Sequence, residues 1–427
     1  MIETEKDNRK LVERAVLVAI QEPGMTPEEI KEHMYELHEL VSTMGVPVVG
    51  DIVVSLRQPQ PRYFLGSGKA EDINERLKEL KADCLIFDCD LAPSQQRNWE
   101  KLTKICVIDR QEVILDIFAA RATTKEAALQ VEVARMEYSL PRLTRAWTHL
   151  SRQQGGAKGT RGEGEKQIEV DRRLVQKRIS RLKKELLEVL KQRETQRKKR
   201  SKSTIAHAAI VGYTNAGKST LMRAVSGANV LVENKLFATL DPTTRKIKLP
   251  SGREMIITDT VGFVRKLPHS LVEAFKSTLE EALIADFIIL VLDASSQYLE
   301  DHRKVTIEVL QELGAAEKEV ITVYNKIDMI DDPVLLARLK AATPSAIFVS
   351  AKTEEGLDIL RTRIDEKISI SSQVCELTIP PERHDVISSL HRSANVLSVK
   401  YQENGSALIT AGIEIRDLKK FAMFINE

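Results

Sequence analysis

One stretch of the chain, Gly212-Tyr213-Thr214-Asn215-Ala216-Gly217-Lys218-Ser219, matches the phosphate-binding pattern G-x-x-x-x-G-K-[ST] without a gap. It follows an apolar run of strand length at 205–211 and precedes a helix-like run at 220–225. A loop between a strand and a helix N-terminus points successive backbone N–H groups at one place, where the helix dipole also attracts an anion. We therefore expect a nucleoside triphosphate to bind here, with Lys218 at the β- and γ-phosphates and the Ser219 hydroxyl on Mg²⁺.

Composition is that of an ordinary globular protein, with 42% hydrophobic and 30% charged residues in 427, a length that predicts about three domains. Four cysteines without ligand spacing to histidine suggest a reducing compartment. No apolar run approaches the ~18 residues that span a bilayer, and residues 1–10 lack the apolar core of a signal peptide. We expect a cytoplasmic monomer without a transmembrane segment.

Charge is distributed unevenly along the chain. Residues 141–204 hold 20 Lys and Arg against 7 Asp and Glu, an excess of 13 positive charges in a protein whose net charge is +2. A basic segment on an otherwise acidic protein indicates a polyanionic partner.

Residues 1–122 alternate strand-like apolar runs with helical patterns, which predicts an N-terminal α/β domain with a largely parallel sheet. Thr26-Pro27-Glu28-Glu29 marks the start of one helix, because it offers an N-cap hydroxyl, a proline at the first position and acids in the first turn. Gly66-Ser67-Gly68-Lys69 lacks the full phosphate-loop spacing, and we interpret it as a turn before a helix.

Residues 123–204 are predicted to form an antiparallel helical hairpin. Apolar residues repeat with 4,3 spacing in two stretches, one from Leu129 to Leu150 and one from Val175 to Val189. Pro141 should kink the first helix. The glycine-rich segment 152–164 between them carries Arg152, Lys158 and Arg161, which predicts a cationic tip that contacts RNA, and 196–202 is predicted to be a basic linker.

Residues 205–368 form the domain of the phosphate loop, and 374–427 are predicted to be a small C-terminal α+β domain after a serine-rich linker at 369–373. Three further motifs each follow a predicted strand of the loop's domain, where open α/β sheets bind ligands. They are Asp259-Thr260-Val261-Gly262, Asn325-Lys326-Ile327-Asp328 and Ser350-Ala351-Lys352.

The motif at 325–328 selects the base. A carboxylate at Asp328 can accept hydrogen bonds from guanine N1–H and from the exocyclic amine, whereas adenine would leave that charge unpaired. Asn325 can hold the ring edge and the phosphate loop, the stem of Lys326 can pack on the base, and residues 350–352 close the other side. The nucleotide is therefore predicted to be GTP, with GDP as the product.

The phosphate end needs a second Mg²⁺ ligand besides Ser219. Asp259 would orient the metal's ligands and the Gly262 N–H would contact the γ-phosphate. The segment 237–244 should supply a threonine, and the residues alone leave Thr239, Thr243 and Thr244 open. The catalytic candidates are Lys218, Asp259 and Gly262. Besides the phosphate loop, the candidate nucleotide-binding residues are Phe237, Ala238, Thr239, Leu240, Asp241, Asp259, Thr260, Val261, Gly262, Asn325, Lys326, Ile327, Asp328, Ser350, Ala351 and Lys352.

Phe263 follows the D-x-x-G motif at the position where Ras-type enzymes place a glutamine that orients the attacking water. An apolar side chain cannot align water. Intrinsic hydrolysis should therefore be slow and should need a group from a rearranged switch or from a partner.

With these motifs the chain resembles the HflX-type GTPases, within the larger group that includes Obg-type enzymes. The resemblance rests on G-Y-T-N-A-G-K-S from Gly212, L-F-A-T-L-D-P-T-T-R from Leu236, D-T-V-G-F from Asp259, and the tip motif that ends at Glu169. At that tip the chain has R-G-E-G-E-K-Q from Arg161, where the family usually has R-G-P-G-E-T-Q; the lost proline leaves the tip less rigid.

The resemblance implies a fold class, a metal ligand and a partner. The fold would be α/β, a P-loop GTPase domain with an N-terminal α/β domain, a helical hairpin and a C-terminal α+β appendage. Thr239 would be the switch ligand of Mg²⁺. The hairpin and the N-terminal domain would bind RNA of the large ribosomal subunit, in ribosome splitting, rescue or biogenesis. Two alternatives are an RNA-binding protein in which GTP is structural, and an ATP-driven RNA remodeller that uses the N-terminal domain.

Overall fold

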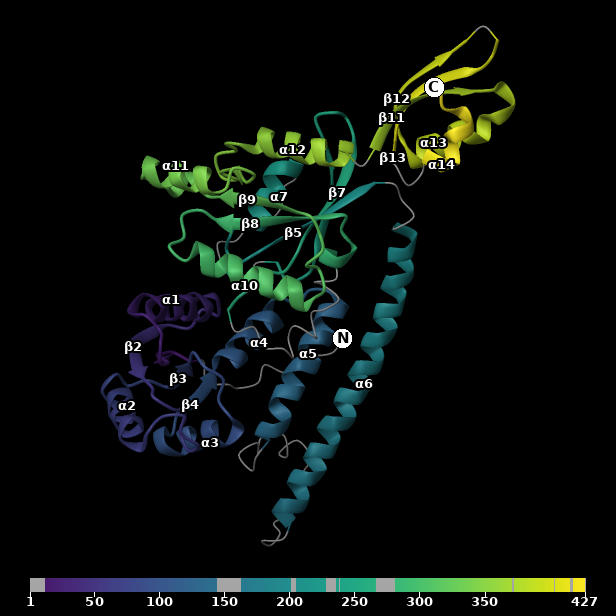
Figure 1. Cartoon of the computed structure of the whole chain (residues 1–427). Helices are drawn as coiled ribbons and strands as arrows, with labels where there is room; N and C mark the ends of the chain where they lie inside the picture. Colours follow the sequence, from purple (N-terminus) through teal and green to yellow (C-terminus); the bar gives the residue numbers. More distant parts are fainter. Residues whose placement is uncertain are drawn as a thin grey trace. The chain divides into compact units, whose positions relative to one another are not determined.

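A computed structural model describes residues 12–143, 163–200, 205–227, 236–237, 239–265, 281–370, 372–402, 404–414 and 418–426 (Figure 1). Contacts divide the chain into two compact units. The first holds the described residues up to Leu187 and those between Leu236 and Leu240, and the second holds the others. Within the described residues, no helix is both long and apolar enough to cross a membrane.

A four-stranded parallel sheet of order β2-β1-β3-β4 forms the core of the first unit. Its elements are β1 (Ala15–Gln21), α1 (Pro27–Thr43), β2 (Val48–Ser55), α2 (Ser67–Glu79), β3 (Cys84–Phe87), α3 (Pro93–Thr103) and β4 (Cys106–Asp109). The predicted start of α1 is confirmed, because the Thr26 hydroxyl accepts from the Glu29 N–H while the Glu29 carboxylate accepts from the Thr26 N–H. The predicted alternation of strands and helices holds throughout these elements.

Helix α4 (Arg110–Arg121) is absent from the sequence prediction. It starts directly after β4, where the buried Asp109 caps it by accepting from the Glu112 N–H at 3.0 Å. Arg110, only 1% exposed, forms ion pairs of 2.7 Å with Asp88 and 2.6 Å with Glu36. The sequence prediction misses this helix, although Asp109, an N-cap aspartate three residues before Glu112, is a usable signal for its start.

In the first unit, α5 (Lys125–Ser139) packs beside the long helix α6 (Glu163–Arg200), whose residues up to Leu187 belong to this unit. Arg178 and Lys183 of α6 pair with Glu132 and Glu137 of α5 at 2.9 and 2.6 Å. Ile179 and Leu182 of α6 are buried, as the 4,3 spacing predicts.

The predicted ends of these helices are wrong in two places. Helix α5 stops at Ser139 and continues as a short 3-10 helix, η1 (Leu140–Arg142), so Pro141 ends the helix instead of kinking it. Residues 196–200 belong to α6 and not to a linker, because arginine, lysine and glutamine favour helix. The rest of the predicted first helix beyond Leu143, and the basic tip up to Gly162, lie outside the described residues.

Glu112 makes the stability of the first unit dependent on pH. Burial, reinforced by the Asp109 carboxylate, raises the pKa of Glu112 to about 7. A carboxyl whose pKa is higher in the folded than in the unfolded protein stabilises the fold fully below the unfolded pKa of about 4.3, and that stabilisation is lost as pH rises through 7.

We expect Glu112→Gln, which resembles the protonated acid, to be about 1–2 kcal/mol more stable than wild type at pH 8 and no more stable at pH 5. Thermal unfolding of the full chain at both pH values measures this. Glu71→Gln, at an exposed position of α2, is the matched control. An equal change in melting temperature at pH 5 and pH 8 would show that Glu112 does not titrate in this way.

The phosphate loop follows β5, a strand of a six-stranded sheet of order β10-β9-β8-β5-β7-β6. All strands of this sheet are parallel except β6. Its elements are β5 (Ala206–Gly212), α7 (Lys218–Ser226), β6 (Thr243–Lys248), β7 (Glu254–Asp259), β8 (Phe287–Asp293), α10 (Leu299–Glu312), β9 (Val320–Asn325), η3 (Ile327–Met329), α11 (Pro333–Ala342), β10 (Ile347–Phe348) and α12 (Leu357–Ile370).

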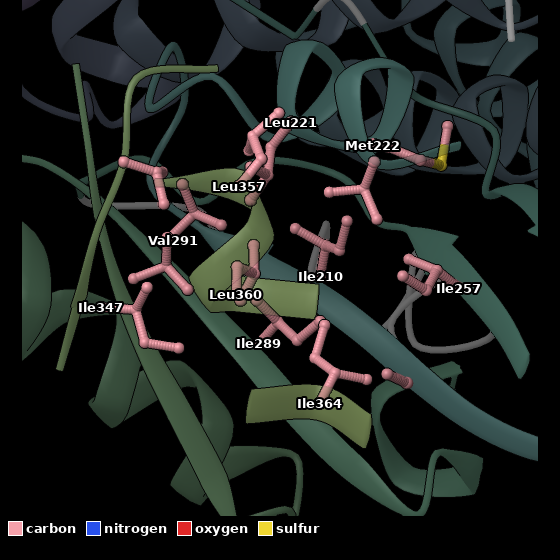
Figure 2. Packing of buried hydrophobic residues seen from close by; sticks show 14 of the residues in the cluster. Ile210, Leu221, Met222, Ile257, Ile289, Val291, Ile347, Leu357, Leu360 and Ile364 are labelled. Carbon is pink, nitrogen blue, oxygen red and sulfur yellow. The ribbon is translucent and has the colours of Figure 1, made fainter. Parts of the chain in front are cut away.

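Helices α7 and α12 cover one face of this sheet through an apolar core. Figure 2 shows Leu221 of α7 and Leu357, Leu360 and Ile364 of α12 packed over the strands. Ile210 of β5 lies among them and is 1% exposed. Burial of each such side chain stabilises the fold by about 1.5–3 kcal/mol, which keeps β5 and α7 fixed on either side of the loop.

The last residues form a three-stranded antiparallel sheet of order β11-β13-β12. Its elements are β11 (Ser372–Ile379), η4 (Pro381–Arg383), α13 (His384–Ser393), β12 (Asn395–Tyr401), β13 (Ala407–Glu414), α14 (Leu418–Phe421) and η5 (Ala422–Phe424). These elements agree with the predicted small α+β domain, and Asn404 and Gly405 lie in the turn between β12 and β13. The predicted serine-rich linker is wrong, because α12 ends at Ile370 and β11 begins at Ser372.

Candidate functional site

Glycines shape the loop between β5 and α7. Gly217 caps α7 with a φ of 88°, a conformation that residues with a Cβ rarely adopt. A Cβ on Gly217 would also collide with the Asn325 side chain, and one on Gly212 would collide with the Val291 carbonyl oxygen. The backbone of the loop therefore approaches β8 and β9 at two points where only glycine fits.

Lys218 is the first residue of α7 and is only 7% exposed. Its ammonium group donates hydrogen bonds to the carbonyl oxygens of Gly212 and Tyr213 at 3.1 and 2.7 Å, so the side chain folds back along the loop. Burial lowers the pKa of Lys218 to about 8, against the opposing effect of the Asp259 carboxylate. A cation held in this way is suited to bind an anion that approaches the loop.

Ser219 and Asp259 meet beside the loop. The Ser219 hydroxyl donates to the Asp259 carboxylate at 2.6 Å, and Asp259 is fully buried at the end of β7. Thr260, also fully buried, donates through its hydroxyl to the Ile210 carbonyl oxygen at 2.8 Å. Val261 is buried too. These contacts bring the second motif against the strand that leads into the loop.

Asn325 joins three parts of the site. Its side-chain amide donates to the Ala216 carbonyl oxygen in the loop at 2.9 Å, and its side-chain oxygen accepts from the Ala351 N–H at 2.9 Å. Asn325 is 2% exposed. The loop, the end of β9 and the segment after β10 are therefore held together by a single buried amide.

The two charged residues of the N-K-x-D motif are both oriented by neighbours. Asp328 accepts a hydrogen bond from the Ser350 hydroxyl at 2.7 Å, and its carboxylate is exposed to solvent. Lys326 adopts a φ of 64° and pairs with Asp293 at 2.7 Å. The sequence prediction misses Asp293, although a polar residue at the end of the apolar strand β8 is a usable signal. Ile327 is buried and Lys352 is exposed.

The predicted switch segment divides between the two units. Phe237 belongs to the first unit and packs its ring edge-on against Phe118 of α4, with ring centroids 4.6 Å apart. Thr239 and Leu240 belong to the same unit, Asp241 belongs to the second, and Ala238 lies outside the described residues.

The structure places the two alternative metal ligands, Thr243 and Thr244, in a strand. Both lie in β6, which pairs with β7, and the Thr244 hydroxyl is 3.0 Å from that of Thr258.

Three families match consecutive parts of the chain. A family described as "GTP-binding GTPase N-terminal" matches residues 31–119, and one described as "GTP-binding GTPase Middle Region" matches 121–200. A third, described as "50S ribosome-binding GTPase", matches 207–326.

Curated relatives are similar along nearly the whole chain. "GTPase HflX" of Akkermansia muciniphila is 46% identical over 434 residues, with 99% of each chain covered. "GTPase HflX" of Escherichia coli is 40% identical over 409 residues and covers 96% of this chain and 95% of its own. Among solved structures, a GTP-binding protein of Sulfolobus solfataricus in complex with GDP is 26% identical over 83% of this chain and 98% of its own, with a TM-score of 0.43.

The fold and site define a class. A mixed six-stranded sheet with the loop G-x-x-x-x-G-K-S between β5 and α7, followed by D-x-x-G and N-K-x-D at the ends of β7 and β9, is a P-loop GTPase, an enzyme that binds GTP and hydrolyses it to GDP and phosphate. The chain belongs to the HflX family of GTPases. The predicted fold class, the family resemblance and the GTPase activity are thereby confirmed.

Proposed function

We propose that this GTPase acts in the cytoplasm on the large ribosomal subunit, in ribosome splitting, rescue or biogenesis, and that ribosomal RNA binds along α6. The observation that supports this most is a basic face of that helix, formed by Arg173, Lys177, Arg181 and Lys184. All four side chains are exposed and line one shallow groove together with Gln176 and Ser180.

The geometry of α6 separates this basic face from its buried face. At 100° per residue, the four basic side chains fall within about one quarter of the helix circumference, opposite Ile179 and Leu182, which are buried. Arg178 and Lys183 are already paired with glutamates of α5, whereas the basic face points away from that helix. A row of cations on the outer side of a helix matches a phosphate backbone.

The match to a family described as a 50S ribosome-binding GTPase supports the choice of this polyanion. The excess of 13 positive charges in 141–204 supports it as well, since it includes the basic face.

At the phosphate end, we assign Lys218 to the β- and γ-phosphates and the Gly262 N–H to the γ-phosphate. Lys218 is already desolvated, so its charge acts on the phosphates at low local dielectric.

The donor set beside the loop fits Mg²⁺. The Ser219 hydroxyl and the Asp259 carboxylate are hard oxygen donors 2.6 Å apart, and Mg²⁺ prefers such ligands. Ser219 would hold the ion directly and Asp259 would orient its water ligands, while Thr239 as the switch ligand stays a prediction from the family resemblance. When bound, Mg²⁺ would offset negative charge on the phosphate oxygens.

At the base end, Asp328 would accept from guanine N1–H and from its exocyclic amine, while Asn325 and residues 350–352 keep the base pocket joined to the loop. The hydrogen bond from Ser350 fixes the Asp328 carboxylate in one orientation, so the carboxylate loses little freedom when the base binds.

Phe263 supports a role for the partner in hydrolysis. Its side chain is 1% exposed and offers no hydrogen-bonding group for the attacking water. We propose that intrinsic hydrolysis is slow and is stimulated on the ribosome, where docking would provide the alignment of the attacking water that Phe263 cannot.

Replacement of Arg173, Lys177 and Lys184 by alanine should weaken binding to isolated large subunits and flatten its salt dependence. Each lost phosphate contact should reduce the slope of log affinity against log salt by about 0.7 to 0.9. Co-sedimentation with large subunits over a salt series measures both quantities.

The matched control removes three exposed lysines elsewhere, Lys248, Lys340 and Lys400, at the same change in net charge. It should retain the wild-type slope. If the slope of log affinity against log salt falls by the same amount in both triple variants, binding follows net charge only, and the basic face of α6 is not the RNA contact. A second triple variant, Arg152, Lys158 and Arg161 to alanine, tests the predicted tip separately.

A further inference from the structure

The D-x-x-G segment is bonded to the phosphate loop through its backbone. The Thr214 N–H donates to the Phe263 carbonyl oxygen at 2.7 Å, and the Phe263 N–H donates to the Gly212 carbonyl oxygen at 3.1 Å. These two bonds form a short parallel bridge between Tyr213 and Phe263. The Thr214 N–H, one of the loop's donors, is therefore bonded to the D-x-x-G segment, which should sense the γ-phosphate.

The bridge leaves no room for a terminal phosphate next to Lys218. A Cβ placed on Gly262 would lie 2.8 Å from the Lys218 ammonium nitrogen and 2.9 Å from the Thr214 Cα. The space between Gly262, the ammonium and the Thr214 backbone is therefore too small for even one carbon atom, whereas a phosphate group is several atoms wide. A γ-phosphate that binds between Lys218 and Gly262 must move the two apart, while the donors at the start of α7 do not depend on this bridge.

A side chain reinforces the closed arrangement. The Tyr213 hydroxyl accepts a hydrogen bond from the Arg265 N–H at 2.8 Å, beyond the bridge. The Tyr213 ring, 6% exposed, stacks on His302 of α10 with centroids 3.9 Å apart and an interplanar angle of 14°. Because α10 fixes the ring, the hydroxyl holds Arg265, three residues after Gly262, at a set position.

We propose that Tyr213, supported by His302, is a positioning residue that holds 262–265 closed over the γ-phosphate position, so that GTP must open this latch and GDP need not. The phosphate-loop pattern leaves the second position free, so phosphate binding alone does not require a tyrosine there. GTP must first shift the equilibrium between the closed and the open state. Any factor by which the latch favours the closed state in that equilibrium therefore lowers the affinity for GTP by the same factor.

Tyr213→Phe removes the hydroxyl and keeps the stacked ring. A net hydrogen bond of ordinary strength corresponds to a factor of about 2 to 10 in an equilibrium constant. We therefore expect Tyr213→Phe to raise the affinity for a non-hydrolysable β,γ-imido GTP analogue about 2- to 10-fold relative to the affinity for GDP, compared with wild type. His302→Ala should shift the same ratio in the same direction. Titration with fluorescent forms of both nucleotides measures the two affinities.

Amide hydrogen exchange without nucleotide gives a second readout, in which the Arg265 N–H should exchange faster in Tyr213→Phe. Tyr401→Phe, at an exposed tyrosine of β12, should change neither readout. An unchanged ratio of GTP-analogue to GDP affinity, or an equal shift in both affinities, would overturn the proposal and leave Tyr213 a packing residue. If wild type bound neither nucleotide, the result would instead contradict the nucleotide site itself.

Discussion

Lys218→Ala is expected to abolish GTP turnover, with a loss of at least about 10³-fold, while the fold remains intact. The reason is electrostatic, because the buried ammonium group would act on charge that develops on the phosphates. The side chain contributes little to the apolar core, since among the described residues its ammonium group donates to the loop's own carbonyl oxygens. Phosphate release at saturating GTP, together with the circular dichroism spectrum, measures both parts of this expectation.

Lys248→Ala, at an exposed lysine of β6 in the same domain, is the control and should turn over GTP as wild type does. Ser219→Ala should cause a comparable loss and should also remove the dependence of turnover on Mg²⁺ concentration. Full turnover by either Lys218→Ala or Ser219→Ala would place the active site elsewhere.

Asp328→Asn is expected to reduce GTP affinity by about 10²- to 10³-fold and to shift preference toward xanthosine triphosphate. The carboxylate accepts from two donors of guanine, and each charge-assisted hydrogen bond contributes about 1.5–3 kcal/mol. An amide at this position presents a donor to a guanine edge that is itself a donor, whereas xanthine presents an oxygen there. Competition of the two nucleotides against labelled GDP measures the preference directly.

Asp331→Asn makes the same substitution at an exposed residue three positions away and should leave the preference unchanged. Equal GTP affinity in wild type and Asp328→Asn would contradict the assignment of the base pocket. Because Ser350 donates to the Asp328 carboxylate, Ser350→Ala should give a smaller loss with the guanine preference retained.

Local signals in the sequence account for much of the nucleotide domain. The close approach of the loop to β8 and β9 requires glycine at 212 and 217. The glycines of the sequence motif therefore predict the backbone conformation of the loop. The strands that precede Asp259 and Asn325 are apolar runs of ordinary length, and their ends are visible as changes from apolar to polar residues. The contact of Asn325 with both Ala216 and Ala351 follows from the order of the motifs in a parallel sheet.

Other features depend on contacts between residues far apart in the sequence. The pairing of Lys326 with Asp293 and the stacking of Tyr213 on His302 each join two segments that are far apart in the sequence, and no local pattern specifies them. The same is true of Thr243 and Thr244, whose strand β6 is defined by pairing with β7 more than by its own largely polar sequence. Pro141 is predicted to kink a helix that in fact ends at Ser139, because proline is compatible with both outcomes.

The most direct test of this account is GTP turnover by the wild-type chain with and without purified large ribosomal subunits, at equal Mg²⁺ and salt concentrations. We predict slow turnover by the chain alone and at least about tenfold faster turnover with subunits, because docking supplies the order that Phe263 cannot provide. The stimulation should be absent in Lys218→Ala and reduced in the triple variant of Arg173, Lys177 and Lys184. Turnover that is the same with and without subunits would contradict a ribosome-dependent GTPase.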